Sequence, residues 1–151
     1  MKKFLSIFFI VGLMLVALTG CTGKTSKKLT NYSSDSPVVN AYFHIGDEYQ
    51  KLPEEKLSKF IEMLNSMELK THMGHVDYYW HGQFGIELEL EDGTFIHYDG
   101  TCYELRSDSM KAGTDNEYKL DKAFIEVLNE NFWDEVGKYF EFGNFVPYDG
   151  F

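Results

Sequence analysis

The side chains with the most chemical potential lie close together in residues 72–81 (HMGHVDYYWH). This segment holds three imidazoles, His72, His75 and His81, together with the carboxylate of Asp77. Imidazole nitrogens are ligands for zinc and copper. The spacing matches no recognised ligand motif, and on a strand Asp77 and His81 would lie about 13 Å apart. Metal capture with zinc or copper is therefore one hypothesis, and a solvated loop with unliganded histidines is the alternative.

The same segment is rich in aromatic rings, of which Tyr79 and Trp80 are the candidates for ligand binding. Exposed rings form a platform on which a sugar or a peptide can stack. The competing interpretation is that these rings cover the core on one side of a strand. The sequence leaves both open.

Further along the chain, Glu87, Glu89 and Glu104 could in principle act as acid and base, which would make the protein a hydrolase. We expect instead that they point outward with His97 and Cys102 and form a solvated face. Cys102 has no neighbouring motif that would lower its pKa, so we expect a small structural residue rather than a nucleophile. No catalytic residue is predicted.

The beginning of the chain carries a different kind of signal. A short cationic start, Met1-Lys2-Lys3, precedes an apolar run to Thr19 that is too short to span a bilayer comfortably. Residues 1–20 thus read as a secretory signal peptide, and residues 18–21 (LTGC) resemble the bacterial lipobox. The resemblance implies cleavage after Gly20 and attachment of lipid, with acyl chains such as palmitate, to Cys21. It places this lipoprotein on the outer, extracytoplasmic face of a cell membrane.

Charge is distributed unevenly along the chain. Residues 21–37 are polar and contain Lys24, Lys27 and Lys28, so we predict a flexible tether between the lipidated cysteine and the domain. Residues 38–151 carry 9 basic and 23 acidic side chains, a net charge of −14. Such a domain is expected to repel nucleic acid. Its charge could attract a cationic peptide or protein partner, and the alternative is that it serves solubility alone.

The patterning of residues 38–151 predicts a single α+β domain. Residues 38–45 and 67–72 read as strands, and residues 76–80 as a further one, because they are rich in β-branched and aromatic side chains. Apolar residues at helical spacing predict one helix over residues 53–66 and a second that begins after Asp121, with a break near Asn131. We therefore expect an antiparallel meander sheet with two amphipathic helices packed on one face. The pattern resembles small lipid-anchored proteins of low-GC bacteria.

The register of the meander in residues 85–105 can be predicted from the alternation of apolar and acidic residues. A two-residue turn at Asp92-Gly93 would mix the two faces, whereas a three-residue loop keeps the apolar face whole. The second choice pairs Leu88 with Ile96, and a two-residue turn at Asp99-Gly100 then pairs Ile96 with Tyr103. The inward side chains are expected to be Ile86, Leu88, Ile96, Tyr98 and Tyr103.

These observations favour a non-enzymatic, membrane-anchored binding or accessory module with an acidic surface for a cationic or protein partner. Metal capture through residues 72–81 is the alternative function, and a hydrolase is the second alternative. The sequence names no cofactor beyond the zinc or copper of the metal hypothesis.

Overall fold

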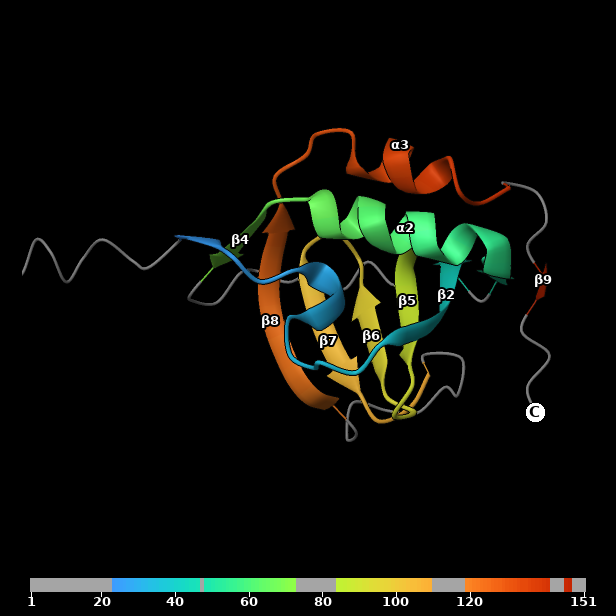
Figure 1. Cartoon of the computed structure of the whole chain (residues 1–151), viewed down its shortest axis with the longest axis horizontal. Coiled ribbons are helices and arrows are strands. Elements are labelled where there is room, and N and C mark those ends of the chain that lie inside the picture. The colour runs from blue at the N-terminus through green and yellow to red at the C-terminus, as the bar shows by residue number, and fades with distance from the viewer. Residues whose placement is uncertain (1–22, 47, 73–83, 110–118, 142–145, 148–151) are drawn as a thin grey trace, which may run out of the picture.

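The computed structural model describes residues 23–46, 48–72, 84–109, 119–141 and 146–147 (Figure 1). In the described residues the sheet has nine strands in the order β1-β4-β8-β7-β6-β5-β2-β3-β9. Every neighbouring pair is antiparallel. The elements in chain order are β1 (Gly23–Thr25), η1 (Leu29–Asn31), β2 (Val38–Ile45), β3 (Glu48–Lys51), α2 (Glu54–Ser66), β4 (Leu69–His72), β5 (Phe84–Leu90), β6 (Phe95–Tyr98), β7 (Cys102–Arg106), β8 (Lys119–Val127), α3 (Phe132–Gly137) and β9 (Val146–Pro147).

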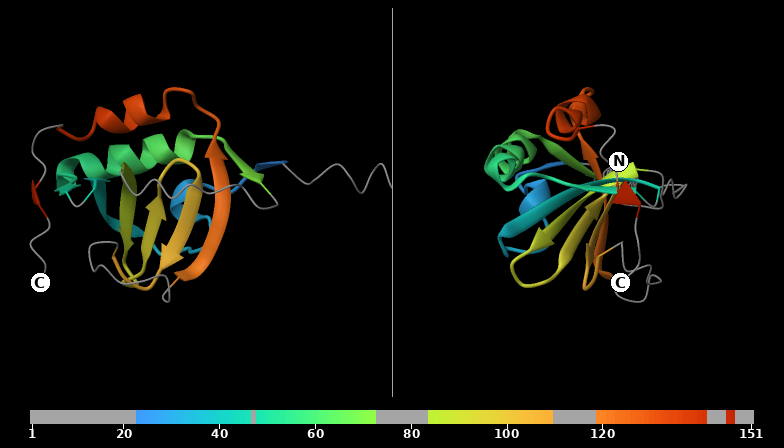
Figure 2. Two further views of the ribbon diagram at one scale, coloured as in Figure 1. Left: turned by 180° about the vertical axis from the view of Figure 1, so that it is seen from behind. Right: turned by 90° about the vertical axis from the view of Figure 1, so that its right-hand side faces the viewer.

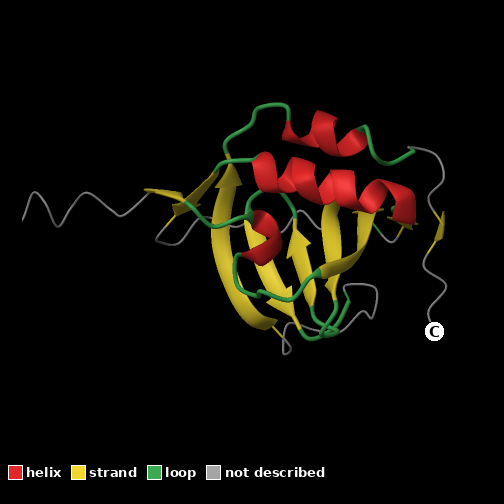
Figure 3. Ribbon diagram, viewed as in Figure 1, coloured by secondary structure: helices red, strands yellow, loops and turns green. Residues whose placement is uncertain are grey.

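The predicted antiparallel sheet with helices is thus confirmed, but strands dominate the fold (Figure 3). The long helix α2 begins directly after Pro53, whose fixed φ suits a helix start, and Glu54 and Glu55 occupy its first turn as predicted. The second helix, α3, has six residues and is much shorter than expected. The strands at residues 38–45 and 69–72 also agree with the prediction.

One hydrophobic core lies between the sheet and the helices. Phe60 and Leu64 of α2 and Phe132 and Val136 of α3 belong to the same buried cluster as the inward side chains of the meander. Figure 2 shows α2 and η1 on the same side of the sheet. The five meander side chains predicted to face inward are all completely buried: Ile86, Leu88, Ile96, Tyr98 and Tyr103.

The predicted register is confirmed at the first turn and wrong at the second. Leu88 pairs with Ile96, but Ile96 pairs with Leu105 rather than with Tyr103. The second loop has three residues, Asp99 to Thr101, and the Asp99 carboxylate accepts hydrogen bonds from the backbone N–H groups of Thr101, at 3.0 Å, and Cys102, at 2.8 Å. The slip is two residues, so each side chain stays on its predicted face.

The helix predicted to begin after Asp121 is wrong, because residues 119–127 form strand β8. Ala123, Ile125 and Val127 face the core at a spacing of two, a pattern that competes with the helical one. β8 lies between β4 and β7 and hydrogen-bonds to both. The ladders on both sides decide the conformation, and the predicted break near Asn131 is where α3 begins.

The prediction of a flexible tether also fails for residues 23–37, which are part of the folded body. β1 pairs with the edge strand β4, and Leu29 of η1 is 1% exposed in the hydrophobic core. The Thr30 hydroxyl donates to Asn65 Oδ1 of α2 at 2.5 Å. The buried Leu29 side chain contributes about 1.5–3 kcal/mol to this packing, and Tyr32 packs against the same core.

Candidate functional site

The face of the sheet opposite α2 carries a row of polar side chains across five strands. The pairing register places Tyr42 of β2, Glu87 of β5, His97 of β6, Glu104 of β7 and Lys122 of β8 side by side. Glu87, His97 and Glu104 are 0%, 4% and 2% exposed. Their predicted orientation is confirmed, but the expectation that they are solvated is wrong. We call the side chains of this face, with their neighbours on the same strands, the polar face.

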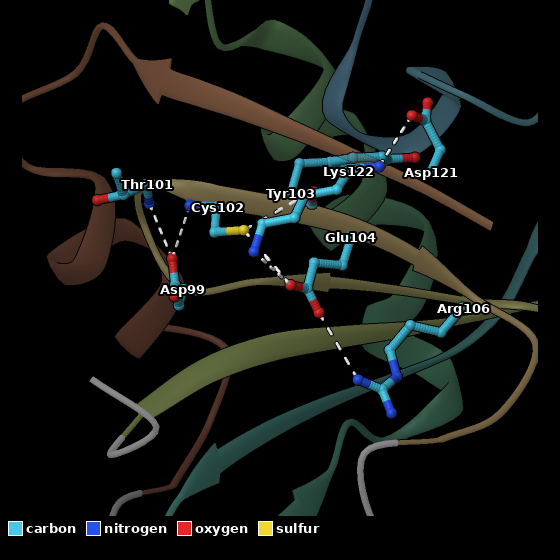
Figure 4. A network of polar contacts seen from close by, with 8 residues as sticks. All are labelled: Asp99, Thr101, Cys102, Tyr103, Glu104, Arg106, Asp121 and Lys122. Atoms are coloured by element: carbon cyan, nitrogen blue, oxygen red, sulfur yellow. Dashed lines mark hydrogen bonds and ion pairs between the residues drawn. The ribbon is translucent and has the colours of Figure 1, made fainter. Parts of the chain in front are cut away.

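Glu104 is the centre of a compact ionic network within the polar face (Figure 4). Its Oε2 lies 3.6 Å from Arg106 Nη1, and its Oε1 lies 3.4 Å from Lys122 Nζ. Arg106 Nη2 is also 3.6 Å from Asp108 Oδ1. Two cations thus compensate the buried Glu104 carboxylate, which would otherwise be costly to remove from water.

The thiol of Cys102 joins the same network without becoming reactive. Its Sγ lies 3.6 Å from Glu104 Oε1. Burial, followed by the neighbouring Glu104 carboxylate, raises the pKa of Cys102 to about 12. Because the thiolate is the nucleophilic form, this geometry describes a structural cysteine, in line with the sequence-based expectation.

Glu87 and Glu89, the two carboxylates of β5 on the polar face, accept hydrogen bonds from uncharged groups. The Ser109 hydroxyl donates to Glu87 Oε1 at 2.6 Å. Glu89 Oε2 accepts from Asn40 Nδ2 at 2.8 Å and from the Tyr42 hydroxyl at 2.9 Å. Burial and the Glu89 carboxylate raise the pKa of Tyr42 above its usual range, which keeps the phenol protonated as a donor. Glu87 and Glu89 are therefore held in fixed positions on β5.

Two buried histidines, His44 and His97, contact each other on the polar face. His44 Nε2 is 3.4 Å from His97 Nδ1, so one ring nitrogen donates and the other accepts. The His44 ring is 2% exposed and stacks on Tyr49, with ring centroids 5.2 Å apart. Burial, followed by the proximity of His97, lowers the pKa of His44 to about 3, and the Asp99 carboxylate opposes that shift.

Gly85 makes room for this histidine pair. A Cβ atom at Gly85 would lie 2.7 Å from His44 Nε2 and 3.0 Å from His97 Cε1. The absence of a side chain on β5 thus lets the His44 ring reach across that strand to β6. His44 was not singled out from the sequence, although strand parity alone places it on the same face as Asn40 and Tyr42.

Of the site residues predicted from the sequence, only His72 lies in the described part of the chain. Its Nε2 is 3.0 Å from Glu126 Oε2 on β8, far along the sheet from the His44–His97 pair. Cys21, His75, Tyr79, Trp80 and His81 lie outside the described residues. Among the residues that are described, no three histidine, cysteine or acidic side chains converge as a metal-binding group.

No known protein family, no curated protein and no solved structure matches this chain. Within the described ranges, no helix has the length and apolar character needed to cross a membrane.

Proposed function

We propose that this protein is a lipid-anchored, extracytoplasmic binding module that is lipidated at Cys21 and receives a cationic peptide or protein partner. The observation that carries the proposal is the half-buried Glu89 carboxylate, held by Asn40 and Tyr42 on the same sheet face as Glu87 and Glu104. Arg106 and Lys122 pair with Glu104 on this face, and Lys51 of β3 and Lys70 of β4 lie on the flanking strands. The net charge of −14 over residues 38–151 extends the same electrostatic preference to the rest of the surface.

The polar face suits recognition better than covalent chemistry. Its carboxylates are fixed by hydrogen bonds and ion pairs, and the Cys102 thiol beside Glu104 stays protonated. Pre-oriented carboxylates bind an ammonium or guanidinium group with little loss of conformational entropy. Glu89 is half-buried, so it is the carboxylate of this set that a partner reaches most directly.

The lipid anchor is tested by the variant Cys21→Ser. Wild-type protein is expected in the membrane fraction after a high-salt wash, because two or more acyl chains hold a protein durably. The variant is expected in the soluble fraction or as the unprocessed precursor. Equal processing and equal membrane retention of the two proteins would refute lipidation at Cys21.

Partner recognition is tested with an oligolysine peptide as the probe, titrated calorimetrically at low and high salt. Binding is expected to weaken steeply as salt rises, because exposed charges are screened. Glu89→Gln is expected to weaken binding roughly two- to fivefold, the range typical of one exposed ion pair. The matched control is Glu62→Gln on the exposed side of α2, and an equal effect of both variants would refute recognition at the polar face.

Metal capture through His72, His75 and His81 is retained as a second candidate on one geometric observation. His72 Nε2 and Glu126 Oε2 are 3.0 Å apart on neighbouring strands and supply two candidate ligand atoms. Thermal melting after EDTA treatment, then with zinc or copper, tests it, because a ligand of the native state raises the melting temperature. A rise that His72→Ala abolishes would support metal capture, and no rise would refute it.

A further inference from the structure

The folded segment that follows Cys21 determines how the domain would meet a membrane. Only Thr22 lies between Cys21 and the first residue of β1, Gly23. Two residues of extended chain span at most about 7 Å. β1 is itself fixed to the sheet, since Gly23 pairs with Thr71 and Thr25 with Leu69 of β4. The lipid on Cys21 therefore has no long tether on which the domain could drift away.

We propose that the edge formed by β1, η1 and β4 rests on an anionic phospholipid surface and fixes the orientation of the domain. The inference builds on the proposed lipidation of Cys21, which brings this edge to the bilayer. We call residues 23–31 with β4 the basal edge.

The charge of the basal edge complements anionic headgroups, in contrast to the rest of the protein. Residues 23–34 contain Lys24, Lys27 and Lys28 and no acidic residue. Lys24 and Lys27 are exposed, and Lys28 is half-buried. On β4, Lys70 adds a fourth ammonium group 3.5 Å from Glu126. Basic side chains next to a bilayer are attracted to its negative surface potential.

Internal contacts hold these lysines at the basal edge. Lys24 Nζ is 2.5 Å from Glu68 Oε2, and both side chains are about two-thirds exposed, at 69% and 64%. Lys27 Nζ donates to the Tyr32 carbonyl at 2.7 Å and lies 4.6 Å from the centroid of the Tyr32 ring. The ammonium groups are therefore directed by η1 and its surroundings rather than by a free chain.

In the proposed orientation, the order of strands places β3, near the opposite edge of the sheet, far from the bilayer. Between β1 and β3 there are seven strand spacings, or roughly 34 Å measured along the sheet. Figure 1 shows β4 and β9 at opposite ends of the body, with α2 running between them. Lys51 of β3 is exposed at that distant end and Lys59 is exposed on α2, so both serve as internal references.

The test uses full-length processed protein reconstituted into vesicles of phosphatidylcholine with phosphatidylglycerol or of phosphatidylcholine alone. Lysines are modified with a membrane-impermeant amine reagent and quantified by mass spectrometry. In the anionic vesicles, labelling of Lys24, Lys27 and Lys28 is expected to fall about fivefold relative to neutral vesicles. Labelling of Lys51 and Lys59 is expected to stay constant. If the labelling of both groups of lysines changed equally between neutral and anionic vesicles, the proposed orientation would be overturned.

A charge variant separates the headgroup contact from the anchor. In Lys24→Gln/Lys27→Gln/Lys28→Gln protein, flotation with vesicles is expected to persist, while Lys70 regains the labelling seen on neutral vesicles. The matched control, Lys51→Gln/Lys59→Gln, is expected to leave Lys70 protected. Unchanged protection of Lys70 in the triple variant would overturn the charge contact. Failure of the wild-type protein to float would instead refute the proposed lipidation of Cys21. It would leave the proposed orientation of the basal edge as a separate question.

Discussion

The two faces of the central strands bury side chains of opposite chemistry to almost the same degree. On β5 and β6 the residues Ile86, Leu88 and Ile96 are fully buried against the helices. The alternate residues of the same strands, Glu87 and His97, are 0% and 4% exposed on the other side. The alternation of apolar and polar residues therefore predicts which face of the sheet a side chain occupies, but it does not predict whether that face is exposed to solvent.

The difference lies in what makes each burial favourable. Apolar burial is non-directional and involves no group that titrates. On the polar face every buried charge depends on a partner at a particular position, as Glu104 depends on Arg106 and Lys122. Removing one partner leaves an uncompensated charge, so the polar face is more specific and more fragile than the apolar face.

The apolar face should give the largest response to truncation. Phe60 is fully buried on α2, and its ring lies 5.4 Å from that of Phe140 and 5.2 Å from that of Tyr139. Phe60→Ala is expected to lower the free energy of unfolding by about 3–5 kcal/mol. Urea denaturation at two pH values should show the same loss at both. A loss that changed strongly with pH would contradict the comparison, and Glu62→Ala on the exposed side of α2 is the control.

Replacing one charged side chain of the ionic network is expected to lower the free energy of unfolding by nearly as much. Arg106→Met leaves the buried Glu104 carboxylate without its guanidinium partner, and we expect a loss of about 3 kcal/mol. Adding Glu104→Gln removes the unpaired charge and should recover part of that loss. A double-mutant cycle from urea denaturation measures the coupling. Strictly additive effects would show that the two groups do not stabilise each other.

Any side chain at Gly85 is expected to destabilise the protein, because it would clash with the histidine pair. Gly85→Ala places a methyl group against the His44 ring and is expected to destabilise the protein by about 1–3 kcal/mol. In a His44→Ala background the same substitution should cost less, because the clash with the ring is gone. Gly23→Ala is the matched control, since nothing lies within 4 Å of its added Cβ. An equal cost of Gly85→Ala in both backgrounds would contradict the assigned role of Gly85.

The smallest expected effect, taken per pH unit, is a decrease in the free energy of unfolding as the pH falls. The pKa of His44 is lowered to about 3 from its ordinary value of 6.5. Between these two pH values His44 is therefore protonated in the unfolded chain and neutral in the folded protein. Stability is thus fully present above pH 6.5 and falls as the pH decreases from 6.5 toward 3, by at most about 1.4 kcal/mol per pH unit. Urea denaturation between pH 7 and pH 5 measures this slope. His44→Phe keeps a ring against Tyr49 and should flatten the slope, and an unchanged slope would assign it to other groups.

Strand β8 shows why local pattern alone was insufficient. Phe124, Val127 and Leu128 have helical spacing, whereas Ala123, Ile125 and Val127 have strand spacing. The sequence supports both patterns over the same residues. Pairing with β4 and β7 selects the strand, because two hydrogen-bonded ladders outweigh a small difference in intrinsic propensity.

The candidate site was predictable only in its parts. The turn dipeptides and the alternation in residues 85–105 gave the correct face for Glu87, Glu89, His97, Cys102 and Glu104. Their burial and the pairing of His97 with His44 were not predictable, since β2 and β5 are joined across 38 residues of intervening chain. Which strands become neighbours is a property of the assembled sheet.

The sequence by itself determined the position of α2, the first turn of the meander, the inward set of apolar side chains and the acidity of the domain. These follow from local periodicity, from turn chemistry and from composition, which need no distant partner. Only the tertiary structure decided that β8 is a strand, that residues 23–31 belong to the body and that the polar face is buried. Each of these outcomes depends on contacts between segments far apart in the chain, such as Leu29 with the core and Lys122 with Glu104. Their free energy is gained only when the whole sheet has formed.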